Sequence, residues 1–75
     1  MNLQERKFLS SLGDRIREHR QARGWTQAEL ADKCDLHRTF IGSVERGERN
    51  ISILNLRLIA RVLRVSLSDL MHDLA

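Results

Sequence analysis

The stretch TQAELADKCDLHRTFIGSVERGER, residues 26–49, predicts two short helices joined by a tight turn, and the rest of the chain is organised around it. Thr26 and Glu29 have the spacing of a capping box, in which each side chain accepts a hydrogen bond from the other residue's backbone amide. Asp35 adopts turn and left-handed conformations more readily than most residues, so it ends the first helix. We therefore expect a helix-turn-helix over about residues 26–46.

The second helix of the pair begins near His37 and ends at Gly47, a residue type common just after helix C-termini. Ile41 and Val44 lie on its inner face. Its outer face carries Arg38, Thr39, Gly42, Ser43 and Arg46. Long donors can read base edges in the major groove, and small residues let the backbone approach closely. The pattern favours a DNA-recognition helix, and a solvated helix face is the alternative.

A first amphipathic helix precedes this pair. Apolar residues recur at intervals of three or four from about Leu3 to Arg23, and Gly24 then stops the helix. Ser10 or Ser11 is an alternative start, since either hydroxyl can cap a helix.

Two C-terminal helices occupy about residues 52–74 and begin at the capping residues Ser52 and Ser66. The first of them carries one apolar stripe of Leu56, Ile59, Ala60 and Leu63 and a second of Leu54, Leu58 and Val62. One stripe suits the core, and the other suits a second subunit. We therefore expect these helices to form a dimer interface from Leu54, Leu58, Val62, Val65, Leu67, Leu70 and Met71.

The composition fits a single small domain, residues 1–75, built as a compact all-α bundle without strands. Hydrophobic residues make up 41% of the chain but aromatic residues only 4%, and there is no proline. The formal charge is +3, from 13 basic and 10 acidic residues, and so small an excess supports nucleic-acid binding only weakly. The positions of the arginines are more informative than their number.

Other classes of function find little support in the sequence. Cys34, the one cysteine, fits a small core residue and a reducing cytoplasm. His19, His37 and His72 lie in separate elements, so we expect no metal site and no other cofactor. No apolar run has membrane-spanning length, and the serines are explained as caps. We therefore expect no membrane association, no small-molecule substrate and no enzymatic activity.

Two segments, IREHRQARGWTQAELA and RTFIGSVERGER, resemble the helix-turn-helix domains of the lambda-repressor and Cro type, also called XRE-like. The resemblance runs from Leu12 onward and implies a compact five-helix lambda-repressor-like DNA-binding domain. Within that family, DLHRTFIGSVERGERNISILNL is most similar to the controller proteins of bacterial restriction-modification systems. This similarity implies a cytoplasmic, sequence-specific transcriptional regulator. Such a regulator binds an inverted-repeat operator in double-stranded DNA as a homodimer and controls its own gene and the endonuclease gene.

The alternatives are a phage-type repressor and an antitoxin-like protein-interaction module. A module of the second kind usually has a partner-binding segment outside the DNA-binding core, and we expect none after Ala75. RNA polymerase is a further candidate partner of a regulator.

The resemblance also implies roles for individual residues. Base contacts are assigned to Arg38, Thr39 and Ser43 on the recognition helix. Contacts to the DNA backbone are assigned to Gln27, Phe40, Arg46, Arg49 and Asn50. Arg20 and Glu45 match a structural ion pair that ties the first helix to the third.

Two positions depart from the family pattern, and a third carries a residue that destabilises a helix. Asp35 stands where the family often has glycine, and His37 stands where it usually has serine or threonine. Gly42 costs the recognition helix about 1 kcal/mol relative to alanine. Close approach to DNA would explain this glycine, and crowding within the protein is the alternative.

Overall fold

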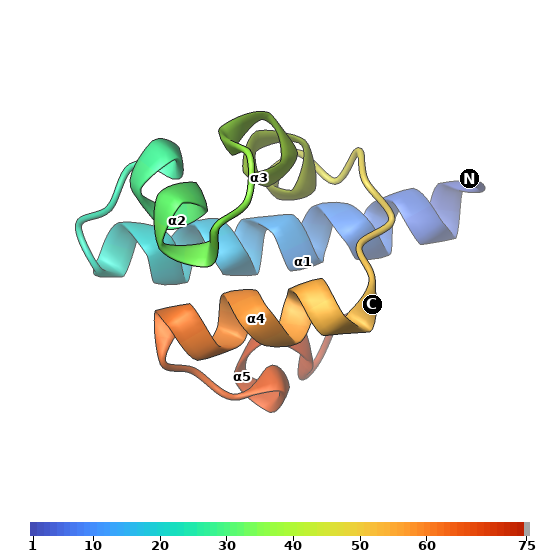
Figure 1. Cartoon of the computed structure of the whole chain (residues 1–75). Helices are drawn as coiled ribbons and strands as arrows, with labels where there is room; N and C mark the ends of the chain where they lie inside the picture. The colour runs from blue at the N-terminus through green and yellow to red at the C-terminus, as the bar shows by residue number, and fades with distance from the viewer. Residues whose placement is uncertain (75) are drawn as a thin grey trace.

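The computed structural model describes residues 1–74, and Ala75 lies outside the described residues. It contains α1 (Leu3–Ala22), α2 (Gln27–Cys34), α3 (Arg38–Glu45), α4 (Ile53–Leu63) and α5 (Leu67–Met71). In the view of Figure 1, α1 crosses the middle of the molecule, with α2 and α3 above it and α4 and α5 below. Residues 1–74 form these five helices and no strand, so the predicted all-α fold is confirmed.

Local capping hydrogen bonds fix the helix ends. Most of these ends lie where the sequence predicts them. Thr26 Oγ1 accepts from the backbone amide of Glu29 at 3.1 Å, and Glu29 Oε1 accepts from the amide of Thr26 at 2.9 Å. Ser52 and Ser66 cap α4 and α5. Asp35 ends α2 in the left-handed conformation, with a φ of 55°.

The start of α1 is close to Leu3, so the alternative starts at Ser10 and Ser11 are wrong. Asn2 and Glu5 form a capping box, with hydrogen bonds of 2.8 and 2.9 Å between each side chain and the other residue's amide. These bonds satisfy amides that would otherwise have no partner at the helix end. The first turns of α1 therefore extend past α3 at the right of Figure 1.

The core is made from apolar faces of all five helices. Its largest fully buried apolar side chains are Ile16, Leu30, Ile41, Ile59, Leu63 and Leu70. The predicted inner stripe of α4 faces this core, and Cys34 is buried in it, as expected for a small core residue. Removing a side chain of this size from water contributes roughly 1.5–3 kcal/mol.

Two glycines let α1 pack directly against the C-terminal end of α3. A Cβ atom at Gly13 would lie 2.6 Å from the carbonyl oxygen of Val44, and one at Gly47 would lie 2.6 Å from Cα of Ser10. Gly47 also has a φ of 73°, which favours glycine. Because these neighbours are backbone atoms, neither position accepts a side chain unless the helices move apart.

Candidate nucleic-acid interface

The outer face of α3 adjoins the start of α2, and together they form a shallow hollow. Its walls include Thr26, Gln27 and Ala28 at the start of α2, Arg38, Thr39 and Gly42 on α3, and Arg46 directly after α3. Arg38 and Thr39 are exposed on the first turn of α3. Within residues 1–74, no carboxylate pairs with Arg38. Its guanidinium is therefore available to an acceptor outside the protein.

Three of the predicted DNA contacts meet at the other edge of α3. Ser43 Oγ donates to the carbonyl oxygen of Phe40 at 2.8 Å. Arg49 Nε lies 3.5 Å from Ser43 Oγ, and the guanidinium carbon of Arg49 lies 5.1 Å from the centre of the Phe40 ring. This cation–π contact holds Arg49 beside the recognition helix. Because the Ser43 proton is directed to the backbone, its hydroxyl offers an acceptor to a base edge.

Arg46 lies over Gly42, next to this cluster. A Cβ atom at Gly42 would lie 3.1 Å from Arg46 Nη1 and 3.4 Å from Gln27 Oε1. Both neighbours are ends of flexible side chains, so packing does not impose a glycine here as it does at Gly13. Arg46 also pairs with Glu48 at 3.1 Å, and Asn50 is exposed nearby. An exposed pair of this kind contributes little to stability.

A buried carboxylate holds the recognition helix against α1 and α2. Glu45 is 1% exposed and accepts from Arg20 Nε at 2.7 Å and from Arg20 Nη2 at 3.0 Å. The predicted ion pair is therefore present, in the bidentate form that fixes orientation best. Gln27 Nε2 donates to the same carboxylate at 3.1 Å, and Arg17 Nη2 donates to the Glu45 carbonyl oxygen at 3.0 Å. Gln27 thus braces α3, and its predicted contact with the DNA backbone is a separate role.

The turn accommodates both residues that depart from the repressor pattern. Asp35 takes the left-handed conformation in which glycine is usual. His37 caps α3, because its Nδ1 accepts from the backbone amide of Thr39 at 3.1 Å. An imidazole nitrogen therefore replaces the serine or threonine hydroxyl, and the start of α3 stays capped.

Two titratable groups near this unit have shifted pKa values. Hydrogen bonds from the backbone and then the side chain of Thr26 lower the pKa of Glu29. Burial raises the pKa of the Cys34 thiol to about 11, so the thiol is protonated at neutral pH and is a poor nucleophile. The described residues contain no group of three potential metal ligands. None of the helices of residues 1–74 is long and apolar enough to cross a membrane.

The residues predicted for a dimer interface differ in exposure. Leu54 is 69% exposed, whereas Leu58, Val62, Val65, Leu67 and Met71 are half-buried. Leu70 was assigned to the interface wrongly, because its side chain is fully buried in the chain's own core. Ile53, which the predicted interface does not include, is 61% exposed. It lies next to Leu54, directly after the cap at Ser52.

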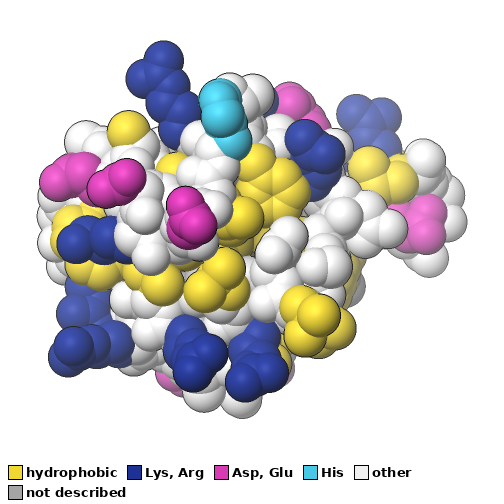
Figure 2. All heavy atoms as spheres, in the orientation of Figure 1, with side chains coloured by type: hydrophobic (Ala, Val, Ile, Leu, Met, Phe, Trp, Pro, Cys, Tyr) yellow, Lys and Arg dark blue, Asp and Glu magenta, His cyan; other side chains and the backbone are white. Residues whose placement is uncertain are grey.

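Basic side chains gather on two sides of the molecule. In Figure 2, Lys and Arg side chains form a row along the lower edge, over α4, and others stand above α2 and α3. The exposed arginines of α4 and its C-cap are Arg57, Arg61 and Arg64. The layer of α2 and α3 and the layer of α4 thus offer separate basic surfaces.

Comparisons with known proteins agree with this geometry. A family model described as helix-turn-helix, HTH_3, matches residues 16–70. Control protein C.BamHI from Bacillus amyloliquefaciens is 42% identical over 60 residues, which cover 79% of this chain and 74% of that protein. Control protein C.SmaI from Serratia marcescens is 40% identical over 60 residues, covering 80% of this chain and 71% of that protein. The crystal structure of the restriction-modification controller protein C.AhdI from Aeromonas hydrophila matches with a TM-score of 0.80 at 40% identity, covering 83% of this chain and 94% of that chain.

Proposed function

The chain belongs to the helix-turn-helix family of DNA-binding transcriptional regulators, and from this premise we propose that it is a controller protein of a restriction-modification system. Its similarity to two control proteins, at 42% and 40% identity, supports this assignment. In this role the protein works in the cytoplasm, where it controls its own gene and the endonuclease gene by occupying an operator between or beside them. It is a regulator and not an enzyme.

The observation that carries the proposal is the position of α3, whose outer face is open to solvent and whose inner side is fixed to other helices. Its outer face exposes Arg38 and Thr39, while Glu45 fixes its inner side to α1 and α2. A rigidly held helix with exposed donors can enter the major groove and read base edges. Arg38, Thr39 and Ser43 make the base contacts in this proposal. Gln27, Phe40, Arg46, Arg49 and Asn50 contact the DNA backbone.

The proposed operator is an inverted repeat bound by a homodimer. Its half-sites lie one helical turn apart, roughly 34 Å, so that both recognition helices face the same side of the duplex. The five helices act as one domain, with α4 and α5 serving both core and dimerisation. The interface centres on the exposed Ile53 and Leu54 and includes the half-buried Leu58, Val62, Val65, Leu67 and Met71. RNA polymerase is the further partner, which the bound dimer blocks or recruits.

Selection of bound duplexes from a random pool tests this function. We expect an inverted repeat that binds about a thousandfold or more tighter than scrambled DNA at physiological salt. Its presence upstream of an endonuclease gene in the source genome would support the controller role over that of a phage-type repressor. Weak, salt-sensitive binding without a preferred sequence would contradict a regulator and favour the interaction-module alternative.

Replacing Arg38 by alanine tests the assigned readout. If Arg38 reads a guanine, the variant loses about 1–3 kcal/mol of binding free energy on the operator and discriminates less at one base position in each half-site. Repeating the selection with the variant measures both effects. An equal loss on all sequences would instead identify Arg38 as a phosphate contact.

A further inference from the structure

One face of α1 continues past the C-terminal end of α3. Gly13 packs against the last turn of α3, and Arg17 Nη2 donates to the carbonyl oxygen of Glu45. Arg6 and Ser10 lie on the same face of the helix, since positions separated by three or four residues share one side. The stripe that holds α3 therefore extends into the first turns of α1, where α3 no longer covers it.

These first turns and the segment after α3 enclose a basic cleft. Its walls include Arg6, Lys7 and Ser10 from α1 and Arg46, Gly47 and Glu48 from the other side. Glu48 is the one carboxylate among these lining residues, and it pairs with Arg46 at 3.1 Å. Nothing acidic in the described chain forms a salt bridge with Arg6 or Lys7. The cleft thus has an excess of positive charge that the protein itself does not neutralise.

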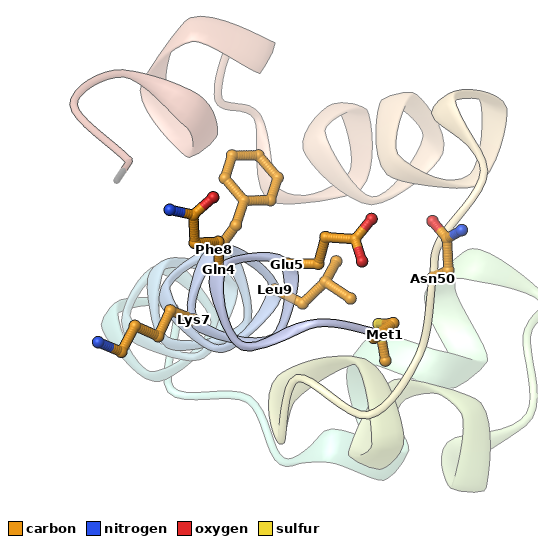
Figure 3. A pocket seen from close by; sticks show the side chains of 7 residues that line it. All are labelled: Met1, Gln4, Glu5, Lys7, Phe8, Leu9 and Asn50. Atoms are coloured by element: carbon orange, nitrogen blue, oxygen red, sulfur yellow. The ribbon is translucent and has the colours of Figure 1, made fainter.

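The cleft is continuous with the proposed DNA surface. Figure 3 shows a neighbouring pocket at the start of α1, where Met1 lies near Asn50 and the side chain of Lys7 points away from both. Arg46 lines both this cleft and the hollow between α2 and α3. The family match begins at residue 16, so Arg6 and Lys7 lie outside the part of the chain that the family model describes.

We propose that Arg6 and Lys7, together with Arg46, form a phosphate clamp that holds the DNA backbone beside the C-terminal end of α3. The clamp rests on the proposed DNA-binding function and lengthens the footprint of each protomer. Guanidinium and ammonium groups bind phosphate oxygens regardless of the base, so the clamp adds affinity and salt dependence without altering the preferred sequence.

A pair of charge-matched double variants tests the clamp. Arg6→Gln with Lys7→Gln removes its two unpaired cations, and Arg61→Gln with Arg64→Gln removes two exposed cations from the far layer. The slope of log affinity against log salt changes by about 0.9 for each phosphate contact. We expect the first variant to reduce the slope by about 3 to 4 for a dimer and the second to leave it unchanged. Glu48→Gln should strengthen operator binding.

Phosphate-ethylation interference locates the contacts directly. Wild-type protein should show interference at phosphates flanking the bases that α3 reads, and the Arg6, Lys7 double variant should lose it there alone. The clamp is refuted if this variant keeps the wild-type slope, or if the Arg61, Arg64 control loses as much. Wild-type protein without any preferred sequence would refute the proposed function instead, so the two failures are distinguishable. Circular dichroism and sedimentation check that each variant is folded and keeps its oligomeric state.

Discussion

At the scale of single residues, Glu45 ties α3 to both α1 and α2. Its carboxylate has almost no exposed surface and receives hydrogen bonds from Arg20 and Gln27. The pairing with Arg20 could be predicted from the resemblance to repressor domains. The bond from Arg17 to the Glu45 carbonyl oxygen could not, because it depends on how closely Gly13 lets α1 and α3 approach. Such an approach is set by tertiary packing and leaves no local sequence pattern.

Replacing Glu45 by alanine should strongly destabilise the fold. The variant leaves the nearly buried Arg20 guanidinium without its partner, and losing one member of a buried pair costs about 3–5 kcal/mol. Urea denaturation at neutral pH measures the loss in free energy of unfolding. Glu48→Ala is the control, since that carboxylate is exposed and its loss should change stability by no more than about 0.5 kcal/mol. Similar losses for both variants would contradict the proposed role of Glu45.

The buried position of Cys34 predicts slow thiol chemistry. Burial raises its pKa from 9.0 to about 11, and the surrounding core blocks access to the sulfur. Near pH 8 we expect Ellman's reagent to react at least about tenfold more slowly with native protein than with the chain unfolded in urea. The pKa of the Cys34 thiol is higher in the folded protein than in the unfolded chain. Its contribution to the free energy of unfolding is therefore fully present below about pH 9 and is lost as pH rises through 11. Equal rates in the two states would contradict a buried thiol.

Among the helices, the ends set by local hydrogen bonds could be predicted best. The caps Thr26 and Ser66 were identified because a capping residue and its partner are three positions apart. Asn2 and Glu5 have the same spacing, and they decide between the alternative starts of α1. Leu70 was misassigned because, on a helix as short as α5, apolar spacing alone does not separate the buried side from the exposed side.

For the candidate site, too, the sequence predicts the exposed positions but not the contacts between segments. The periodicity of α3 places Arg38 and Thr39 outside, and both are exposed. The cluster of Phe40, Ser43 and Arg49 was not predictable as a unit, because it forms only when the segment after α3 folds back over the helix. Sequence patterns thus locate residues on a face, while the contacts between faces depend on the folded chain.

A substitution at Gly42 distinguishes two explanations for a glycine inside α3, which are close approach to DNA and crowding within the protein. Its nearest potential contacts are the side-chain ends of Arg46 and Gln27, which can move. We expect Gly42→Ala to raise the free energy of unfolding by up to about 1 kcal/mol through helix propensity. The same variant should bind the operator less tightly, since the methyl group displaces Arg46 and holds the backbone away from the groove. Urea denaturation and operator titration measure the two effects.

Gly13→Ala is the matched control for this substitution. Its Cβ would collide with backbone of α3, so we expect a loss of about 1–3 kcal/mol from overpacking. A comparable loss in Gly42→Ala would mean that crowding within the protein, and not close approach to DNA, requires the glycine.

For the whole molecule, size limits how two copies can occupy one operator. The protomer measures 31 × 23 × 21 Å, close to the spacing of roughly 34 Å between the half-sites of one helical turn. Protomers on adjacent half-sites of the proposed operator are therefore close enough for side chains at their facing ends to meet. Ile53 and Leu54, at the start of α4, are the exposed apolar residues of the layer that does not carry α3. Their exposure is costly in a monomer, and in the proposed dimer contact between two copies relieves it.

Leu54→Gln should weaken dimerisation without unfolding the chain, because its side chain is 69% exposed in the protomer. In a two-fold interface each copy loses one leucine, and burial of such a side chain contributes roughly 1.5–3 kcal/mol. We expect the dimer dissociation constant to rise at least about tenfold in sedimentation equilibrium, and operator binding to shift to higher protein concentration. Leu3→Gln is the matched control, since Leu3 is 67% exposed but lies on α1. If both variants dimerise like the wild type, the interface lies elsewhere, and the apolar start of α4 must serve another contact.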